Sequence, residues 1–344
     1  MEKFRDKIFN EEVFETYRKT LQSTKENSLI KNALFTNVNK YKEKMSEQSG
    51  GYQVKEPIKG RIGGNPVNYD GNTNIPKGSE RDTFYQNKIC YGRAKAWGEY
   101  DFSSDITGAN FKAEAQEVNE YWDEQRQSTV LAILEGIFGM TGGVNGQFVS
   151  KHTYDITANV NPELSADALN RAAQKALGDK KAKLDVIFMH SAVSTNLEGL
   201  NLIEFLKYTD EAGIQRDLTI GTFNGRLVVI DDEMPVTSDS TGDIYTSYVF
   251  QKGFFEYENI GAEVPSEIAR DPYDKGGKTD LITRVREMIV PTLISYKGTG
   301  TVSPENSDFA TGSNWELVNN DKTSTAKVYV DDKLIPIARI ISRG

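Results

Sequence analysis

Residues 111–139 are the one long stretch in which core-type positions recur at helical spacing. The stripe comprises Val118, Trp122, Thr129, Ile133 and Ile137. Polar residues such as Glu117, Asp123 and Arg126 cover the opposite side, and a Gly-rich break at 142–143 follows. A period of 3.6 with polar positions opposite is typical of an amphipathic helix. The pattern therefore predicts a helix about 40 Å long, at about 1.5 Å per residue.

Residues 150–290 alternate between helical and extended patterns. Ser165 is placed to cap a helix that runs to Leu177, and Gly178 is suited to its C-terminal turn. The apolar run 184–189 predicts a buried strand. We expect a second helix over 194–208, with Leu202, Phe205 and Leu206 in the core.

Strand patterns dominate the rest of this stretch. Asn224-Gly225 separates two β-rich runs, and this dipeptide favours the positive φ angles of a two-residue hairpin turn. Residues 247–250 and 253–257 are predicted to form another strand pair. Further strands are expected at 286–290, 292–296 and near the C-terminus. The predicted fold class is α+β with a mixed or antiparallel sheet.

The first third of the chain has too few apolar residues for a core of its own. Residues 1–48 are polar with scattered apolar positions, and residues 49–98 are rich in Gly and Pro. Short extended stretches at 52–55 and 83–85 predict a long β-hairpin that projects from the body. A segment this lean becomes ordered only when it packs on something else, and we expect a neighbouring copy to provide that surface.

The charge is divided unevenly. Residues 1–98 contain 18 Lys and Arg against 12 Asp and Glu, a net of +6, whereas the rest contains 23 against 38, a net of −15. Complementary potentials between a basic loop and the acidic body of another copy would favour ordered association. Chance drift along solvated faces is the alternative, and the sequence leaves both open.

Composition narrows the possible functions. No apolar run approaches the roughly 18 residues of a membrane span, and the charged N-terminus does not resemble a signal peptide. A single cysteine, Cys90, excludes an intrachain disulfide and a multi-cysteine metal site. Two histidines, His152 and His190, leave little material for a histidine-based centre.

The candidate chemical motifs do not meet their requirements. Gly277-Lys278-Thr279 lacks the earlier glycine of a phosphate-binding loop, because that position holds Pro272. Asp231-Asp232-Glu233 directly follows a predicted strand, where successive side chains point to opposite faces. The three carboxylates would therefore not converge on one metal ion, and a solvated turn is favoured. His190 has no nucleophile elbow beside it and is interpreted as structural. We assign no catalytic, cofactor-binding or metal-binding residue and expect no cofactor.

The order of these parts resembles the major capsid proteins of tailed bacteriophages, which have the Hong Kong 97-type fold. The resemblance starts near residue 50 and depends on motif order. The motifs include Gly92-Arg93-Ala94-Lys95-Ala96-Trp97, Ser103-Ser104-Asp105-Ile106-Thr107-Gly108, Tyr121-Trp122, Met189-His190-Ser191-Ala192, Phe223-Asn224-Gly225-Arg226 and Asn314-Trp315.

The resemblance implies four regions and a structural role. They are an N-terminal arm (1–48), an extended loop (49–98), a peripheral domain with a long spine helix (99–149 and 284–344) and an axial domain (150–283). Copies would form hexamers and pentamers of an icosahedral shell around double-stranded DNA, bound without sequence specificity. The expected location is the virion, after assembly in the cytoplasm of a bacterial host.

The resemblance also implies partners and contact residues. We expect a portal protein, no membrane, and a separate scaffolding protein, because only some fifty residues precede the loop. The residues expected between copies are Lys55, Lys59, Arg61, Lys77, Arg81 and Trp122. Some members crosslink Lys to Asn between subunits; Lys55, Lys59 and Lys77 qualify by location alone.

Two other interpretations are kept. One is the shell protein of an encapsulin-like nanocompartment, which has the same fold and holds an enzyme instead of a genome. The other is a soluble hydrolase that uses carboxylates, since 50 acidic residues supply many accidental pairs.

Overall fold

The computed structural model describes residues 35–42, 52–62, 65–74, 81–101, 105, 115–209, 215–298, 300–323 and 325–344. For Asn37 and residues 115–117, 204–209 and 215–220 it describes the backbone only. Most of the predicted N-terminal arm, and Lys77 among the predicted contact residues, therefore lie outside the described residues.

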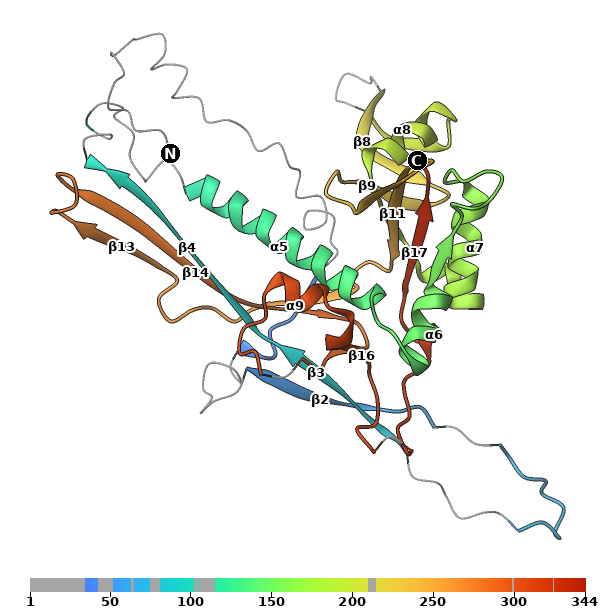
Figure 1. The fold of residues 1–344 in the computed structure, drawn as a ribbon. Coiled ribbons are helices and arrows are strands. Elements are labelled where there is room, and N and C mark those ends of the chain that lie inside the picture. The colour runs from blue at the N-terminus through green and yellow to red at the C-terminus, as the bar shows by residue number, and fades with distance from the viewer. Residues whose placement is uncertain are drawn as a thin grey trace.

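A five-stranded sheet is built around one long strand (Figure 1). β14 pairs antiparallel with β4 along one edge, and with β12 and β13 at different ends of the other edge. β1 adds to β12 in parallel. The strands are β1 (Phe35–Asn37), β4 (Tyr91–Tyr100), β12 (Phe255–Asn259), β13 (Ser266–Asp271) and β14 (Lys278–Pro291).

The second sheet has eight strands. Two neighbouring pairs, β5 with β17 and β6 with β9, are parallel and the others antiparallel. Of the two predicted arrangements, mixed or antiparallel, this sheet has the mixed one. The strands are β5 (Thr153–Asp155), β6 (Val186–Met189), β7 (Ile203–Thr209), β8 (Gln215–Phe223), β9 (Arg226–Ile230), β10 (Val236–Asp239), β11 (Gly242–Phe250) and β17 (Ile337–Ser342).

Helices cover and connect the sheets. The main ones are α5 (Ala115–Phe138), α6 (Gly143–His152), α7 (Ala166–Leu177), α8 (Ser191–Gly199) and α9 (Asn306–Ala310). Three 3₁₀ segments are η3 (Gly178–Lys183), η4 (Gly312–Asn314) and η5 (Asp332–Leu334). A small sheet of β15 (Ile294–Tyr296) and β16 (Trp315–Leu317) packs beside α9. The hairpin of β2 (Gln53–Lys59) and β3 (Thr83–Ile89) extends from the base of the five-stranded sheet (Figure 1).

The long helix α5 contributes one half of its length to the main hydrophobic core. Its C-terminal half contributes Val130, Ile133, Leu134, Ile137 and Phe138 to one buried cluster. The same cluster contains side chains from both large sheets, so this half of α5 fills the junction between them. A second cluster joins α7 and α8 to the eight-stranded sheet.

Several predicted elements are confirmed. α5 spans 24 residues, about 36 Å at 1.5 Å per residue. The Ser165 hydroxyl accepts a hydrogen bond from the Ala168 amide at the start of α7, and Gly178 adopts a positive φ of 62° at its end. Asn224 and Gly225 have φ values of 50° and 74° in the turn between β8 and β9, as a type I′ turn requires.

The helix predicted over 194–208 is wrong in its second half. α8 ends at Gly199, Asn201 takes a positive φ of 54°, and the chain then continues as β7. A left-handed residue cannot continue an α-helix, so the pattern of apolar residues that follows belongs to a strand. Leu202, expected in the core, is 36% exposed.

The predicted pairing of 247–250 with 253–257 is also wrong. β11 lies in the eight-stranded sheet and β12 in the five-stranded sheet, because Gly253, with φ 73°, redirects the chain between them. The two large sheets accordingly do not follow the region boundaries that the resemblance implies. β17 joins the sheet of residues 153–250, whereas β12 and β13 join the sheet of β4.

Candidate assembly surface

The outer part of the hairpin exposes apolar side chains. Seven residue pairs, from Gln53 with Ile89 to Lys59 with Thr83, form its ladder. Beyond that ladder lie Ile62, Val67 and Tyr69, which are 77%, 41% and 90% exposed. Three apolar side chains on one projecting loop are thus available for contact with another molecule.

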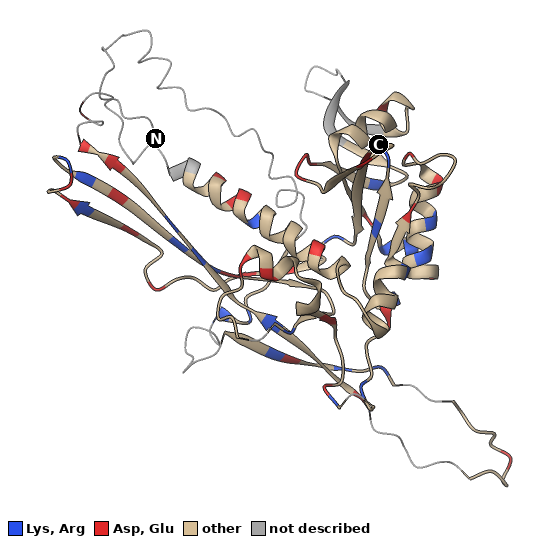
Figure 2. Cartoon of the chain, viewed as in Figure 1, with Lys and Arg blue, Asp and Glu red and all other residues tan. Residues whose placement is uncertain are grey.

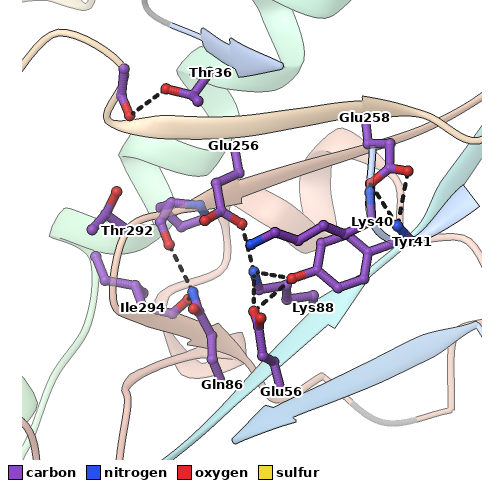
Figure 3. A network of polar contacts seen from close by, with 12 residues as sticks. Thr36, Lys40, Tyr41, Glu56, Gln86, Lys88, Glu256, Glu258, Thr292 and Ile294 are labelled. Carbon is purple, nitrogen blue, oxygen red and sulfur yellow. Dashed lines mark hydrogen bonds and ion pairs between the residues drawn. The ribbon is translucent and has the colours of Figure 1, made fainter. Parts of the chain in front are cut away.

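The base of the hairpin is anchored by a buried ammonium group (Figure 3). The Lys88 side chain is 1% exposed, and its Nζ lies 2.6 Å from the Glu56 carboxylate of β2 and 2.5 Å from the Glu256 carboxylate of β12. It also donates to the Tyr41 hydroxyl, at 2.9 Å. Tyr41 in turn donates to Glu56, at 2.6 Å. Lys88 therefore joins three segments that are distant in sequence.

The titration of this cluster follows from its contacts. Burial by itself would lower the pKa of Lys88, but bonds to Glu256, Glu56 and Tyr41 raise it. Burial and the bond to Glu56 raise the pKa of Tyr41 to about 12. Burial alone would raise the pKa of Glu56, yet the bonds from Lys88 and Tyr41 together lower it. All three groups thus keep the protonation states that the network needs near neutral pH.

Further polar bonds fix the hairpin to the body. The Gln86 amide nitrogen donates to the Pro291 and Ile294 carbonyls, at 2.9 and 3.0 Å, where β14 leads into β15. The Tyr85 amide donates to the Asn319 carbonyl at 2.8 Å. Since Gln86 and Lys88 are both at most 5% exposed, the inner end of β3 belongs to the interior of the subunit.

A short piece of the predicted arm is seated on the five-stranded sheet. β1 extends the sheet beside β12, and the buried Glu258 carboxylate accepts the amides of Lys40, Tyr41 and Lys42 at 2.7–3.2 Å. A carboxylate that receives several backbone N–H groups in this way fixes the local chain direction. The seat places Tyr41 against Lys88 (Figure 3).

The long helix is fixed to β14 by two buried contacts. Trp122 is 6% exposed, and its indole nitrogen donates to the Thr283 hydroxyl at 3.1 Å. Arg126 pairs with the 1% exposed Glu287 at 2.7 Å. Burial would lower the pKa of Arg126, but Glu287 raises it. Trp122, predicted between copies, is therefore placed inside the subunit, where little of its surface remains for a neighbour.

Four other predicted contact residues, Lys55, Lys59, Arg61 and Arg81, lie on or next to the hairpin strands. Figure 2 shows basic and acidic positions along both strands. Lys55 pairs with Asp321 and lies over the Tyr85 ring, so it already has partners within the chain. Lys59, Arg61 and Arg81 are exposed, and none forms an ion pair with any residue the structure describes. The described loop residues 61, 62 and 65–74 include one cation, Arg61, and one acid, Asp70. The described part of this loop therefore has balanced charges, and Lys59 and Arg81 lie at or next to the two strand ends that border the loop.

The residues considered for chemistry have structural roles. His190 Nδ1 accepts the Ala192 amide at the start of α8, and His152 Nδ1 bonds the Ile337 carbonyl. Burial lowers the pKa of His152 and raises the pKa of the Cys90 thiol. Asp231, expected in a solvated turn, is instead 5% exposed and accepts from Gln127 of α5.

Metal clusters and membrane-spanning helices are both absent from the described residues. Those residues contain no group of three His, Cys, Asp or Glu side chains arranged to hold a metal ion. Within the same residues, no helix has the length and apolar character needed to cross a membrane.

The buried network gave no signal in the sequence. Polar Gln86 and Lys88 occupy every second position of β3, as polar residues do on a strand with one face in solvent. From the sequence, such polar residues are predicted to be exposed. Their partners lie from 32 residues away, for Lys88 and Glu56, to 208 residues away, for Gln86 and Ile294. Only the fold brings Tyr41, Glu56, Glu256 and Lys88 together.

Comparison with known proteins identifies the family. No family model matches the chain. The chain is, however, 30% identical over 234 residues to the major capsid protein of Bacillus phage SPP1. The matched region covers 67% of this chain and 68% of that protein. The chain belongs to the bacteriophage major capsid protein family. The capsid subunit is accordingly a structural component of a virion and not an enzyme, and neither the nanocompartment nor the hydrolase interpretation is favoured.

Solved capsids share the fold of this capsid subunit. The capsid of cyanophage Pam1 matches with a TM-score of 0.60 at 9% identity, over 99% of this chain and 97% of that chain. The capsid of Ralstonia phage GP4 gives 0.53 at 10% identity, over 91% and 88%. The capsid of Helicobacter pylori bacteriophage KHP30 gives 0.52 at 11% identity, over 100% of both chains. The predicted α+β, Hong Kong 97-like fold is confirmed.

Proposed function

We propose that this capsid subunit forms hexamers and pentamers that close into an icosahedral shell around double-stranded DNA. Membership of the capsid family supports self-assembly into a shell of many copies. The hairpin supports the manner of assembly, because its base is anchored while Ile62 and Tyr69 stand exposed beyond the body. In the proposal, the outer loop of one copy lies on the body of the next.

The remaining parts of the proposal concern domains and partners. The eight-stranded sheet with α7 and α8 is assigned to the axial domain. The five-stranded sheet with α5 is assigned to the peripheral domain. With these assignments β12 and β13 belong to the peripheral domain instead of the axial domain, and β17 belongs to the axial domain instead of the peripheral domain. A scaffolding protein and a portal protein act during assembly in the bacterial cytoplasm. The net charge of −9 limits adhesion to the enclosed DNA.

Electron microscopy of the purified protein tests the proposal. We expect closed shells of uniform size, in which five-fold and six-fold capsomers can be resolved. Replacing Ile62→Ser and Tyr69→Ser together removes apolar surface from the loop, so shells should form only at higher protein concentration. The matched control is Val160→Ser, a similar change at a side chain that is 99% exposed on another part of the subunit. Particles of one or two chains under all conditions would contradict the proposal.

A further inference from the structure

The arm, the hairpin and the five-stranded sheet meet at Lys88. Its ammonium contacts Tyr41 of the arm, Glu56 of the hairpin and Glu256 of β12 (Figure 3). With 1% of the side chain exposed, water cannot replace a lost partner without the structure opening. A buried polar group that loses its partner costs more than the bond itself contributed.

A second contact controls whether Tyr41 reaches this position. Glu258 is 3% exposed, and the hydrogen bonds of its carboxylate go to the amides of residues 40–42. No bond joins Glu258 to a described residue of the hairpin. Glu258 therefore acts on the hairpin without a direct bond to it, and the arm segment that it holds carries Tyr41 to Lys88.

We propose that this network is a latch, in which seating of arm residues 35–42 on the sheet fixes the hairpin in its observed direction. The two events stabilise each other, because undocking the arm removes the Tyr41 hydroxyl from both Lys88 and Glu56. Coupling of this kind is reciprocal, so a change in the hairpin also loosens the arm. Its consequence for assembly rests on the proposed function: a subunit with a docked arm presents the outer loop in a defined direction.

Hydrogen exchange on unassembled full-length subunits tests the latch. Glu258→Gln keeps the shape of the side chain and removes its charge, which weakens the seat of residues 40–42. We expect amides of β2 and β3 to exchange about tenfold faster, although the carboxylate of residue 258 is not bonded to any described residue of the hairpin. Glu267→Gln is the matched control, because it makes the same change at a carboxylate on the exposed strand β13 that pairs with Arg284. It should leave the hairpin amides unchanged.

The reciprocal experiment starts from the hairpin. Glu56→Gln should accelerate exchange of the Lys40 and Lys42 amides. These amides are bonded to Glu258 and not to Glu256 or the hairpin, so a faster exchange there has to pass through the network. If the Glu258→Gln variant does not fold, the Tyr41→Phe variant is used instead, because it removes only a hydroxyl group. Hydrogen exchange is then measured at the amides near Lys59 and Thr83, at the end of the ladder away from Tyr41.

The outcomes separate the latch from the proposed function. Faster exchange in the arm with an unchanged hairpin overturns the latch, even where electron microscopy shows normal shells. Faster exchange in both segments supports the latch, whether or not the protein forms shells.

Discussion

The two ends of the hairpin differ in what determines their structure. At the inner end, Gln86 and Lys88 are buried and bonded to several parts of the same chain. At the outer end, Ile62 and Tyr69 are mostly exposed. The inner end is therefore completed within the chain, and the proposed contact with a neighbouring copy concerns the outer loop rather than the base of the hairpin.

Removing the outer loop tests this difference most severely. The Gly60 amide donates to the Asp82 carbonyl at 2.8 Å, so a short Gly-Ser turn can replace residues 61–81. We expect a folded subunit with an unchanged thermal midpoint and no shells, because the base keeps all its bonds. Calorimetry and electron microscopy measure the two results.

A larger deletion provides the contrast. Removing residues 52–88 also removes Gln86 and Lys88, which leaves Glu256 without its cation. We expect that variant to be less stable than the loop deletion. Equal stability of the two deletions would contradict the distinction between base and loop.

Breaking the ion pair between α5 and β14 shows what a buried contact within the subunit is worth. Arg126→Met leaves Glu287 buried without its cation, so the free energy of unfolding should fall by about 3 kcal/mol. Urea denaturation measures this loss. The double variant Arg126→Met/Glu287→Leu should recover much of it, since no charge is then buried; a double variant as unstable as the single one would contradict the explanation.

Charge reversal at the outer end addresses contacts between copies. Lys59→Glu with Arg61→Glu should raise the protein concentration needed for assembly about tenfold at low salt, with little change in subunit stability. The effect should largely vanish at about 1 M salt, where the Debye length is about 3 Å. Lys181→Glu with Lys183→Glu is the matched control on η3. Light scattering follows assembly, and equal effects in both pairs would argue against specific complementarity.

Acid pH has the smallest expected effect. The pKa of Glu56 is lowered in the folded state, so its contribution to stability is present above the ordinary carboxylate pKa and is lost as the pH falls through the lowered value. The difference in thermal midpoint between the wild-type subunit and Glu56→Gln should therefore shrink below about pH 4.5. A difference that stays constant down to about pH 3 would show that the Glu56 charge is not used.

Local patterns predicted the elements whose stability is decided locally. The stripe of α5, the Ser165 cap and the Asn224-Gly225 turn are each specified by residues within a few positions of one another. The prediction of a helix through residue 208 failed because Asn201 turns the chain, and apolar residues after it suit a helix or a strand equally well. The periodicity placed Trp122 on the apolar stripe of the helix, but its hydrogen-bond partner Thr283 is 161 residues away and could not be predicted from local pattern.

By itself, the sequence determined the α+β class, the long helix, the projecting hairpin and the resemblance to phage capsid proteins. Tertiary structure alone decided which sheet each strand joins and where Lys88 finds its carboxylates. The physical reason is range: caps, turns and periodicity act between near neighbours in the chain, whereas a buried charge is stabilised by groups that only the complete fold brings together.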